Sequence, residues 1–336
     1  MKLSLFDYDL TPEAIAQSAA EPRDSSRLLV LHRSSGEIEH RYFGDILEYL
    51  RPGDLLVVNN TKVMAARLEA RKRTGAKVEV LVLEVTGPRL CRALVRPGRR
   101  AMPGTALLFA DGRTAVVRGQ TPDGGRELEF SDGAELRGWI ESTGAVPLPP
   151  YIHQSMPDST RYQTVYSRHL GSAAAPTAGL HFTPELLDRA LSHGIEIASV
   201  TLHVGVDTFR PVKTVDIEAH EMHSEWYHVP HETAEAVRRA TGRIVAVGTT
   251  SVRTLESAAE APRQLRPGAD STRLYVRPGY QFQCVDGLLT NFHVPRSSLV
   301  ILVSAFATRE RILTAYNEAL SRGYRFLSLG DAMLII

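Results

Sequence analysis

Apolar and polar positions follow two different patterns along this chain, and the change of pattern divides it. In the outer parts, uninterrupted apolar runs at residues 28–31, 55–58 and 244–247 are typical of strands buried on both faces of a sheet. Amphipathic stretches lie between these runs. Thr183 followed by Pro184 begins one helix, and residues 308–322 have helical periodicity. We also predict a helix beginning at Thr11, a helix over residues 233–240, and strands over residues 198–204, 325–329 and 333–336.

The middle of the chain, residues 62–150, has short strand-like runs without a convincing helix. The runs are separated by Gly or Pro turns and lie at residues 78–83, 90–95, 105–110, 114–118 and 127–130. Closely spaced short strands of this kind favour a small β-barrel. Residues 147–150, Pro-Leu-Pro-Pro, form a stiff connector back to the α/β pattern. We therefore predict an α/β domain of residues 1–61 and 151–336, into which a barrel of residues 62–150 is inserted.

Composition narrows the class of protein. The 336 residues contain no apolar run of membrane-spanning length, and the first residues lack the apolar region of a signal peptide. Two distant cysteines, Cys91 and Cys284, do not make a disulfide framework or a zinc cluster. These features indicate a cytoplasmic protein with no membrane partner.

Charge is unevenly distributed. Residues 62–100 hold eleven Lys or Arg against three Glu, a net charge of +8 in a chain whose total is +1. Such a segment favours a polyanionic partner, and Arg71, Lys72 and Arg73 are its densest cluster. A solvated, Arg-rich surface is the alternative.

Polar loops that follow predicted strands carry the candidate chemistry. Five of the twelve histidines lie in these loops, beside Gly, Thr and Ser: His181, His203, His220, His223 and His293. An α/β enzyme builds its pocket from loops of this kind.

The segment Gly248-Thr249-Thr250-Ser251, between a buried strand and a helix, is a candidate anion site. Helix N-termini and hydroxyls bind carboxylates and phosphates, and Arg253 adds a cation. Helix capping by Thr and Ser is the structural alternative. Neither a Walker loop nor a G-x-G-x-x-G fingerprint is present.

The segment from His220 to Glu225 could bind a metal ion or transfer protons. Its histidines, His220 and His223, are three residues apart, whereas the H-E-x-x-H motif requires four. Proton transfer suits these groups better, because imidazole titrates near neutral pH. A solvated loop is the alternative. Asn291 and His293 end a further strand-like run.

Together these motifs resemble the S-adenosylmethionine:tRNA ribosyltransferase-isomerase family, bacterial enzymes of queuosine synthesis. The resemblance extends along the whole chain. Its strings include Phe-Asp-Tyr-Asp-Leu at 6–10, Arg-Asp-Ser-Ser-Arg-Leu at 23–28, Ala-Pro-Thr-Ala-Gly-Leu-His-Phe-Thr at 175–183, Gly-Thr-Thr-Ser-Val-Arg-Thr at 248–254 and Gly-Asp-Ala-Met-Leu-Ile at 330–335. Two positions depart from the family pattern, since Asp207 and Thr308 stand where the family usually has Gly.

The resemblance implies a three-layer α/β sandwich with an inserted small antiparallel β-barrel. It also implies the reaction: the ribosyl part of S-adenosylmethionine is transferred to 7-aminomethyl-7-deazaguanine at the wobble position of tRNA and isomerised. Epoxyqueuosine forms, and adenine and methionine leave. S-adenosylmethionine is consumed, and no metal or other cofactor is implied.

Two or three proton transfers and no hydride are needed, which suits a site rich in His and carboxylates. We expect His181 and Glu225 as proton carriers, with His203, His220 and His223 as alternatives. The remaining expected substrate contacts are Thr177, Thr249, Thr250, Ser251, Arg253, Asn291 and His293. We expect a monomer. Two other classes stay open: a non-catalytic RNA-binding protein, and a metal-dependent hydrolase using His220, His223 and Glu225.

Overall fold

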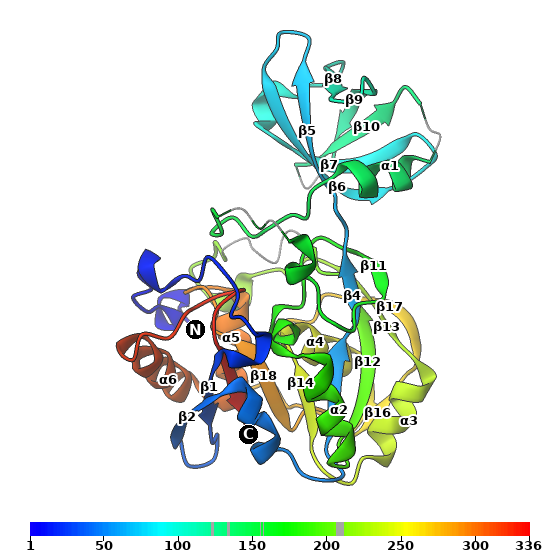
Figure 1. The fold of residues 1–336 in the computed structure, drawn as a ribbon. Coiled ribbons are helices and arrows are strands. Elements are labelled where there is room, and N and C mark those ends of the chain that lie inside the picture. Colours follow the sequence, from blue (N-terminus) through cyan, green and yellow to red (C-terminus); the bar gives the residue numbers. More distant parts are fainter. Residues whose placement is uncertain (122–123, 133–134, 155, 157, 206–211) are drawn as a thin grey trace. The chain divides into compact units, whose positions relative to one another are not determined.

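The computed structural model describes residues 1–121, 124–132, 135–154, 156, 158–205 and 212–336. The chain forms two compact units (Figure 1). One unit comprises Met1–Lys62, Pro149–His169 and Ala175–Ile336, and the other comprises Val63–Leu148 and Leu170–Ala174. The boundaries expected from the sequence place residues 170–174 in the α/β domain, whereas these residues group with the second unit.

The first unit is built on a mixed sheet that, within the described residues, has nine strands. Their spatial order is β17 (Gly268–Thr272), β13 (Glu225–Val229), β12 (Glu196–Leu202), β3 (Leu55–Asn59), β14 (Ile244–Val247), β18 (Gly287–Asn291), β19 (Ala332–Ile335), β1 (Arg27–Leu31) and β2 (Ile38–Tyr42). The neighbours β12, β3, β14 and β18 are parallel, as are β19 and β1. The N-terminal strand β1 thus pairs with the C-terminal strand β19, so both ends of the chain complete one sheet.

Both faces of the central strands are covered, which explains their continuous apolar sequence. Every residue of β3, β14 and β18 is buried. Because successive side chains point to opposite faces, Leu56 and Val58 pack with Leu186 of α2 (Pro184–Ser192) on one side. On the other side, Asn59 contacts Thr250 of α4 (Thr249–Ala258). The arrangement is the predicted three-layer α/β sandwich.

Most of the helices that the sequence predicts are present in the first unit. Thr183 accepts a hydrogen bond from the Leu186 amide at the start of α2, with Pro184 in the first turn. The remaining helices of this unit include α3 (His231–Arg239), α5 (Ser298–Ala307) and α6 (Arg309–Ser321), with short 3₁₀ segments at Phe43–Tyr49 and Thr177–His181.

The second unit contains a closed antiparallel barrel, as predicted. Around the barrel the strands are β10 (Arg126–Phe130), β7 (Leu90–Arg96), β6 (Lys77–Val85), β5 (Arg67–Lys72), β8 (Ala106–Phe109) and β9 (Thr114–Gln120). Alternate residues of β6, such as Val78, Val80 and Val82, point inward and form the core. Arg71 and Arg73 are exposed and Lys72 is half-buried, where β5 ends.

Three sequence predictions are wrong. Residues 325–329 are not a strand, since only Phe326 forms an isolated bridge, to Ile15. The helix expected at Thr11 is a single 3₁₀ turn, Pro12–Ala14. The middle region does contain a helix, α1 (Leu136–Thr143), whose Leu136 and Ile140 pack into the barrel core. Gly138 in its first turn weakens the helical signal, so tertiary packing decides its conformation.

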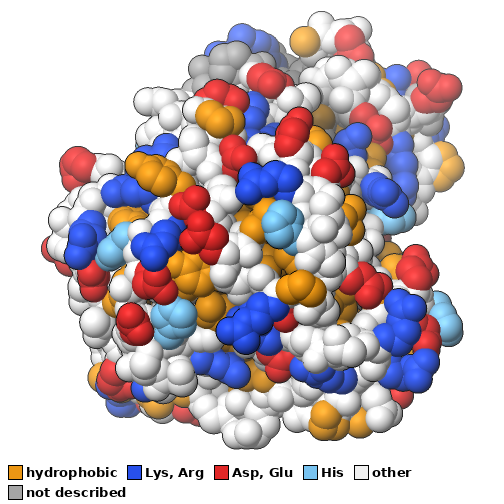
Figure 2. Space-filling model, turned by 60° about the horizontal axis from the view of Figure 1, so that its bottom comes forward, with side chains coloured by type: hydrophobic (Ala, Val, Ile, Leu, Met, Phe, Trp, Pro, Cys, Tyr) orange, Lys and Arg blue, Asp and Glu red, His pale blue; other side chains and the backbone are white. Residues whose placement is uncertain are grey.

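No helix among the described residues is long and apolar enough to span a membrane. On the face that Figure 2 shows, Lys and Arg side chains are interspersed with Asp and Glu. Charge on that face therefore does not mark a binding surface for a polyanion.

Candidate active site

A pocket opens in the α/β unit near the carboxyl ends of the parallel strands β12 and β14. Gly205, which follows β12, and Arg253, in the second turn of α4, belong to its lining, together with Glu225 at the start of β13. The open space measures about 710 Å³, part of it continuous with solvent. Leu274, Val276, Leu299 and Leu302 give it apolar walls. An open α/β sheet usually binds its ligand at this edge.

A buried ion pair forms the polar end of the pocket. Arg253 is 5% exposed and Glu225 is 7% exposed. The Nη1 of Arg253 donates to Oε2 of Glu225, and its Nε donates to the Leu274 carbonyl oxygen at 3.2 Å. The Gly205 amide donates to Oε1 of Glu225 at 2.9 Å. The remaining nitrogen of Arg253, Nη2, is buried and has no hydrogen-bond partner among the described residues.

A buried, unpaired guanidinium nitrogen on a residue that lines a pocket indicates an anionic ligand. Leaving a buried charged donor unsatisfied costs free energy, whereas a carboxylate matches its geometry and charge. The pocket therefore suits a molecule with a carboxylate at one end and an apolar or cationic portion further along.

The hydroxyls at the start of α4 are mostly engaged inside the protein. Ser251 is fully buried and donates to the Val247 carbonyl oxygen at 2.7 Å. Thr250 accepts from Asn59 Nδ2 at 3.1 Å. Thr249, the first residue of the helix, is buried. The candidate anion site thus depends mainly on Arg253, while the Thr and Ser residues order the helix start.

The structure places His220 and His223 in the same pocket as Glu225 and Arg253. The ring of His220 meets the ring of Tyr275 edge to face, with 5.4 Å between centroids. Burial lowers the pKa of His220, and His223 contributes in the same direction. A neutral imidazole in this position can accept a proton.

His203 lies away from this group, on the opposite face of the sheet. Its Nδ1 is 2.8 Å from Oγ1 of Thr61, and its ring stacks on Trp226. Burial lowers its pKa. It is not among the residues that line the Arg253 pocket.

His181 belongs to a buried chain of hydrogen bonds. Thr177 donates to Oδ1 of Asn291 at 2.9 Å, which turns the Asn291 amide nitrogen toward Nε2 of His181 at 3.2 Å. Nε2 is therefore the acceptor, and Nδ1 carries the hydrogen toward Oγ of Ser26 at 2.8 Å. Three residues that the sequence proposed separately, Thr177, His181 and Asn291, are thus brought together.

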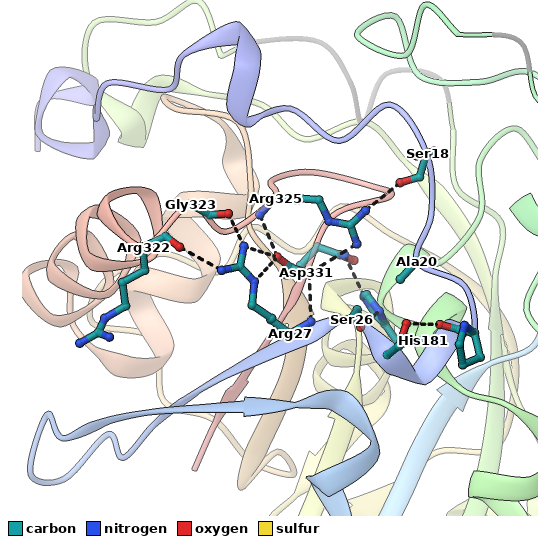
Figure 3. A network of polar contacts seen from close by, with 12 residues as sticks. Ser18, Ala20, Ser26, Arg27, His181, Arg322, Gly323, Arg325 and Asp331 are labelled. Carbon is teal, nitrogen blue, oxygen red and sulfur yellow. Dashed lines mark hydrogen bonds and ion pairs between the residues drawn. The ribbon is translucent and has the colours of Figure 1, made fainter.

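A charged network lies beside His181 (Figure 3). Asp331 is buried and accepts from the backbone amides of Arg27 and Arg325, at 3.0 and 2.8 Å. Burial lowers the pKa of His181 to about 4, although the Asp331 carboxylate acts in the opposite direction. His181 is consequently neutral at pH 7. It lines a small separate cavity with Arg23, so His181 and Glu225 do not share one pocket.

His293 is held by hydrogen bonds within the protein. Its Nε2 is 2.8 Å from Oγ1 of Thr290, its amide donates to Tyr316, and its carbonyl oxygen accepts from Tyr8. Burial lowers its pKa to about 3. The Nε2, the amide and the carbonyl oxygen of His293 are thus all engaged within the protein.

No group of three His, Cys, Asp or Glu side chains in the described parts of the chain is placed to hold a metal ion. His220, His223 and Glu225 line one pocket but do not form such a group.

The sequence analysis missed Ser26, Leu274 and Tyr275 as site residues. Leu274 and Tyr275 come one residue after the end of β17. The Leu-Tyr-Val run at 274–276, close behind a polar strand, was the available signal. Of the two departures from the family pattern, Asp207 lies outside the described residues. Thr308 precedes α6 with φ 71°, a conformation that favours glycine, which explains why Gly usually stands there.

The fold and the pocket define the class of protein: an α/β enzyme with an inserted barrel, whose pocket combines an ion pair with imidazole groups at the sheet edge. Comparison with known proteins gives the family. The family model described as "Queuosine biosynthesis protein" matches residues 3–335.

Relatives of similar length support the match. The chain is 54% identical to an S-adenosylmethionine:tRNA ribosyltransferase-isomerase of Symbiobacterium thermophilum, and 54% identical to one of Moorella thermoacetica. Both alignments cover all of each chain. A crystal structure of an S-adenosylmethionine tRNA ribosyltransferase from Thermotoga maritima matches 99% of this chain and all of its own, with TM-score 0.58 and 42% identity. The chain belongs to the queuosine biosynthesis protein family, which confirms the resemblance read from its motifs.

Proposed function

We propose that this protein transfers the ribosyl moiety of S-adenosylmethionine to 7-aminomethyl-7-deazaguanine at the wobble position of tRNA. The sugar is isomerised in the reaction, epoxyqueuosine forms, and adenine and methionine are released. The chain is 54% identical over its full length to relatives named for this activity, which supports the proposal. The protein would act in the cytoplasm as a monomer, with S-adenosylmethionine consumed as a substrate and no further cofactor.

The observation that carries the proposal is the unpaired Nη2 of Arg253 in the pocket. S-adenosylmethionine has one carboxylate, at its methionine end, and Arg253 would bind it. The adjacent Glu225 carboxylate would face the methionine ammonium group, so an ion pair would recognise a zwitterion. Leu274 and Leu302 would line the path of the methionine side chain.

The chemistry assigns work to the neighbouring histidines. The sulfonium acidifies the hydrogens of its adjacent sugar carbon, so a base is required there. His220 and His223 line the pocket, and the lowered pKa of His220 keeps its ring neutral and able to accept that proton. Glu225, paired with Arg253, would serve in binding rather than in proton transfer. This assignment replaces the expectation that Glu225 is a proton carrier.

His181 would act from its own cavity, through a fixed tautomer. Thr177 and Asn291 hold Nε2 as an acceptor. Protonation or hydrogen bonding helps adenine to leave, and the aminomethyl group must lose a proton before it attacks. A neutral His181 suits the second task, because Nε2 can accept a proton once the substrate amine replaces the Asn291 amide as its partner.

The test is product analysis with purified protein, S-adenosylmethionine and tRNA that carries the deazaguanine precursor. We expect free adenine and methionine by chromatography and an epoxyqueuosine nucleoside by mass spectrometry. S-adenosylhomocysteine as the product would indicate methyl transfer and contradict the proposal.

Arg253→Gln tests the binding role. Losing a charge-assisted bond to a carboxylate weakens affinity by about 10- to 100-fold, so the KM for S-adenosylmethionine should rise accordingly. A sulfonium analogue without the carboxylate should bind the variant and the wild type equally well. The matched control is Arg238→Gln, which removes an exposed guanidinium paired with Glu235 on α3.

A further inference from the structure

Trp226 is unusually exposed for a tryptophan in a sheet. It lies in β13, where Glu225, Tyr227 and Val229 are buried, yet it leaves 42% of its surface accessible. Strand alternation puts Trp226 and His228 on the face opposite Glu225. Trp226 therefore lies outside the Arg253 pocket, and the proposed binding of S-adenosylmethionine does not use it.

The ring of Trp226 is nearly parallel to two neighbouring rings. The ring of His203, the residue that follows β12, stacks on it with centroids 4.9 Å apart and planes 20° apart. The ring of His228 follows at 6.3 Å and 11°. On the other side of β13, the residue opposite Trp226 is Ser271, which is small and exposed. The position directly opposite Trp226 on β17 thus carries only a small side chain.

Basic residues lie in the segments next to these rings. The hydroxyl of Thr61 contacts both Nδ1 of His203 and the carbonyl oxygen of His169, at 2.8 and 3.4 Å. His169 also acts electrostatically on His203. Lys62 and Arg168 adjoin these residues in sequence, and Lys62 is exposed. Asp270, the acidic neighbour of Ser271, is paired with Arg266.

A ligand that matches exposed aromatic rings next to basic residues has a planar ring and negative charges. An unpaired nucleobase with its phosphates has both. Proteins bind single-stranded RNA by stacking bases on Trp, Tyr, Phe or His and by holding the phosphates with Lys and Arg. An enzyme that modifies a base must also take it out of the stack, which leaves neighbouring bases without partners. An anticodon loop supplies such bases.

We infer that Trp226, with His203 and His228, is a stacking platform for an unpaired base of the tRNA anticodon loop. This inference rests on the proposed function, which makes tRNA the substrate. It adds a contact surface on the α/β unit to the basic cluster of the barrel.

The chain's two tryptophans make a direct test possible. Trp139 lies in the barrel unit, where its indole nitrogen donates to Asp111, and Trp226 lies on the platform. An anticodon stem-loop RNA is titrated into the protein while tryptophan fluorescence is followed. Stacking on Trp226 should quench the emission of the wild type. Trp226→Phe keeps a ring for stacking but removes the fluorophore, so the quench should disappear while affinity changes by less than about threefold.

Trp226→Ala removes the ring and should weaken stem-loop binding about tenfold or more, the usual loss for one base–aromatic stack. Leu191→Ala is the matched control, since Leu191 is a similarly exposed apolar side chain, on α2 of the same unit. A fully paired RNA duplex should cause no quench. Binding of S-adenosylmethionine by Trp226→Ala should be unchanged.

Two results would overturn the inference. One is a quench that persists in Trp226→Phe. The other is an RNA affinity of Trp226→Ala equal to that of the wild type. If this variant also changes the sedimenting mass, Trp226 instead makes a contact between copies of the chain. Failure of the proposed function looks different, because the stem-loop would still quench Trp226 while no adenine is released.

Discussion

The buried ion pair between Arg253 and Glu225 yields a prediction that can be worked out from the structure. Both side chains are 6% exposed, so solvent screens their interaction little. Arg253→Met leaves the Glu225 carboxylate without its countercharge in the protein interior. Breaking a buried pair in this way costs about 3–5 kcal/mol. Glu225→Gln leaves a buried guanidinium and should cost a similar amount.

The double variant Arg253→Met/Glu225→Gln should be less destabilised than the sum of the single variants. It contains no buried unpaired charge, so the coupling free energy should reach about 2–3 kcal/mol. The control is the exposed pair of Arg266 and Asp270, whose side chains are 56% and 52% exposed. Its coupling should stay below about 1 kcal/mol.

The assay is urea unfolding followed by tryptophan fluorescence in a Trp139→Phe background. The remaining tryptophan, Trp226, is adjacent to Glu225 and reports on the α/β unit. Each variant is measured against that background, so the cost of replacing Trp139 cancels. A coupling no larger than that of the surface pair would refute the argument, because it would mean that water reaches the Arg253–Glu225 pair.

Three further predictions concern catalysis, pH and tRNA. His181→Ala should lower turnover by about 100-fold or more at unchanged circular dichroism, the usual loss for a proton carrier, and near-wild-type turnover would make His181 structural. Burial lowers the pKa of His181 and His293 to about 4 and about 3, from 6.5. As the pH falls, the unfolded chain therefore takes up these protons before the folded chain does. The contribution of the two residues to the unfolding free energy is complete above pH 6.5 and decreases toward pH 4, by roughly 2–3 kcal/mol per pH unit for both together. Urea midpoints that stay constant between pH 7 and 5 would contradict this prediction. Replacing Arg71, Lys72 and Arg73 by Gln should weaken tRNA binding and reduce the salt slope by up to about three, with S-adenosylmethionine affinity unchanged, whereas an unaltered slope would make the cluster a solvated surface.

Most of the architecture could be predicted because its signals are local. The apolar runs of β3 and β14, the Thr183–Pro184 helix start and the alternating strands of the barrel each depend on residues close in sequence. The wrong predictions have the opposite character. Residues 325–329 resemble a strand locally, but the Arg325 amide donates to Asp331 and not to a neighbouring strand. The helix α1 forms because it packs against the barrel core.

The sequence by itself determined the family, the α/β and barrel units, and the presence of Arg253, Glu225 and the histidines in loops beside strands. Only the tertiary structure decided which of these side chains meet. It joined Glu225, Arg253, His220 and His223 in one pocket, assigned His181 to a separate buried chain, and put His203 with Trp226 on the opposite face of the sheet. The physical reason is that a motif fixes the chemistry of each loop, whereas strand order and the two-residue period of each strand fix the partners and the face to which each side chain points.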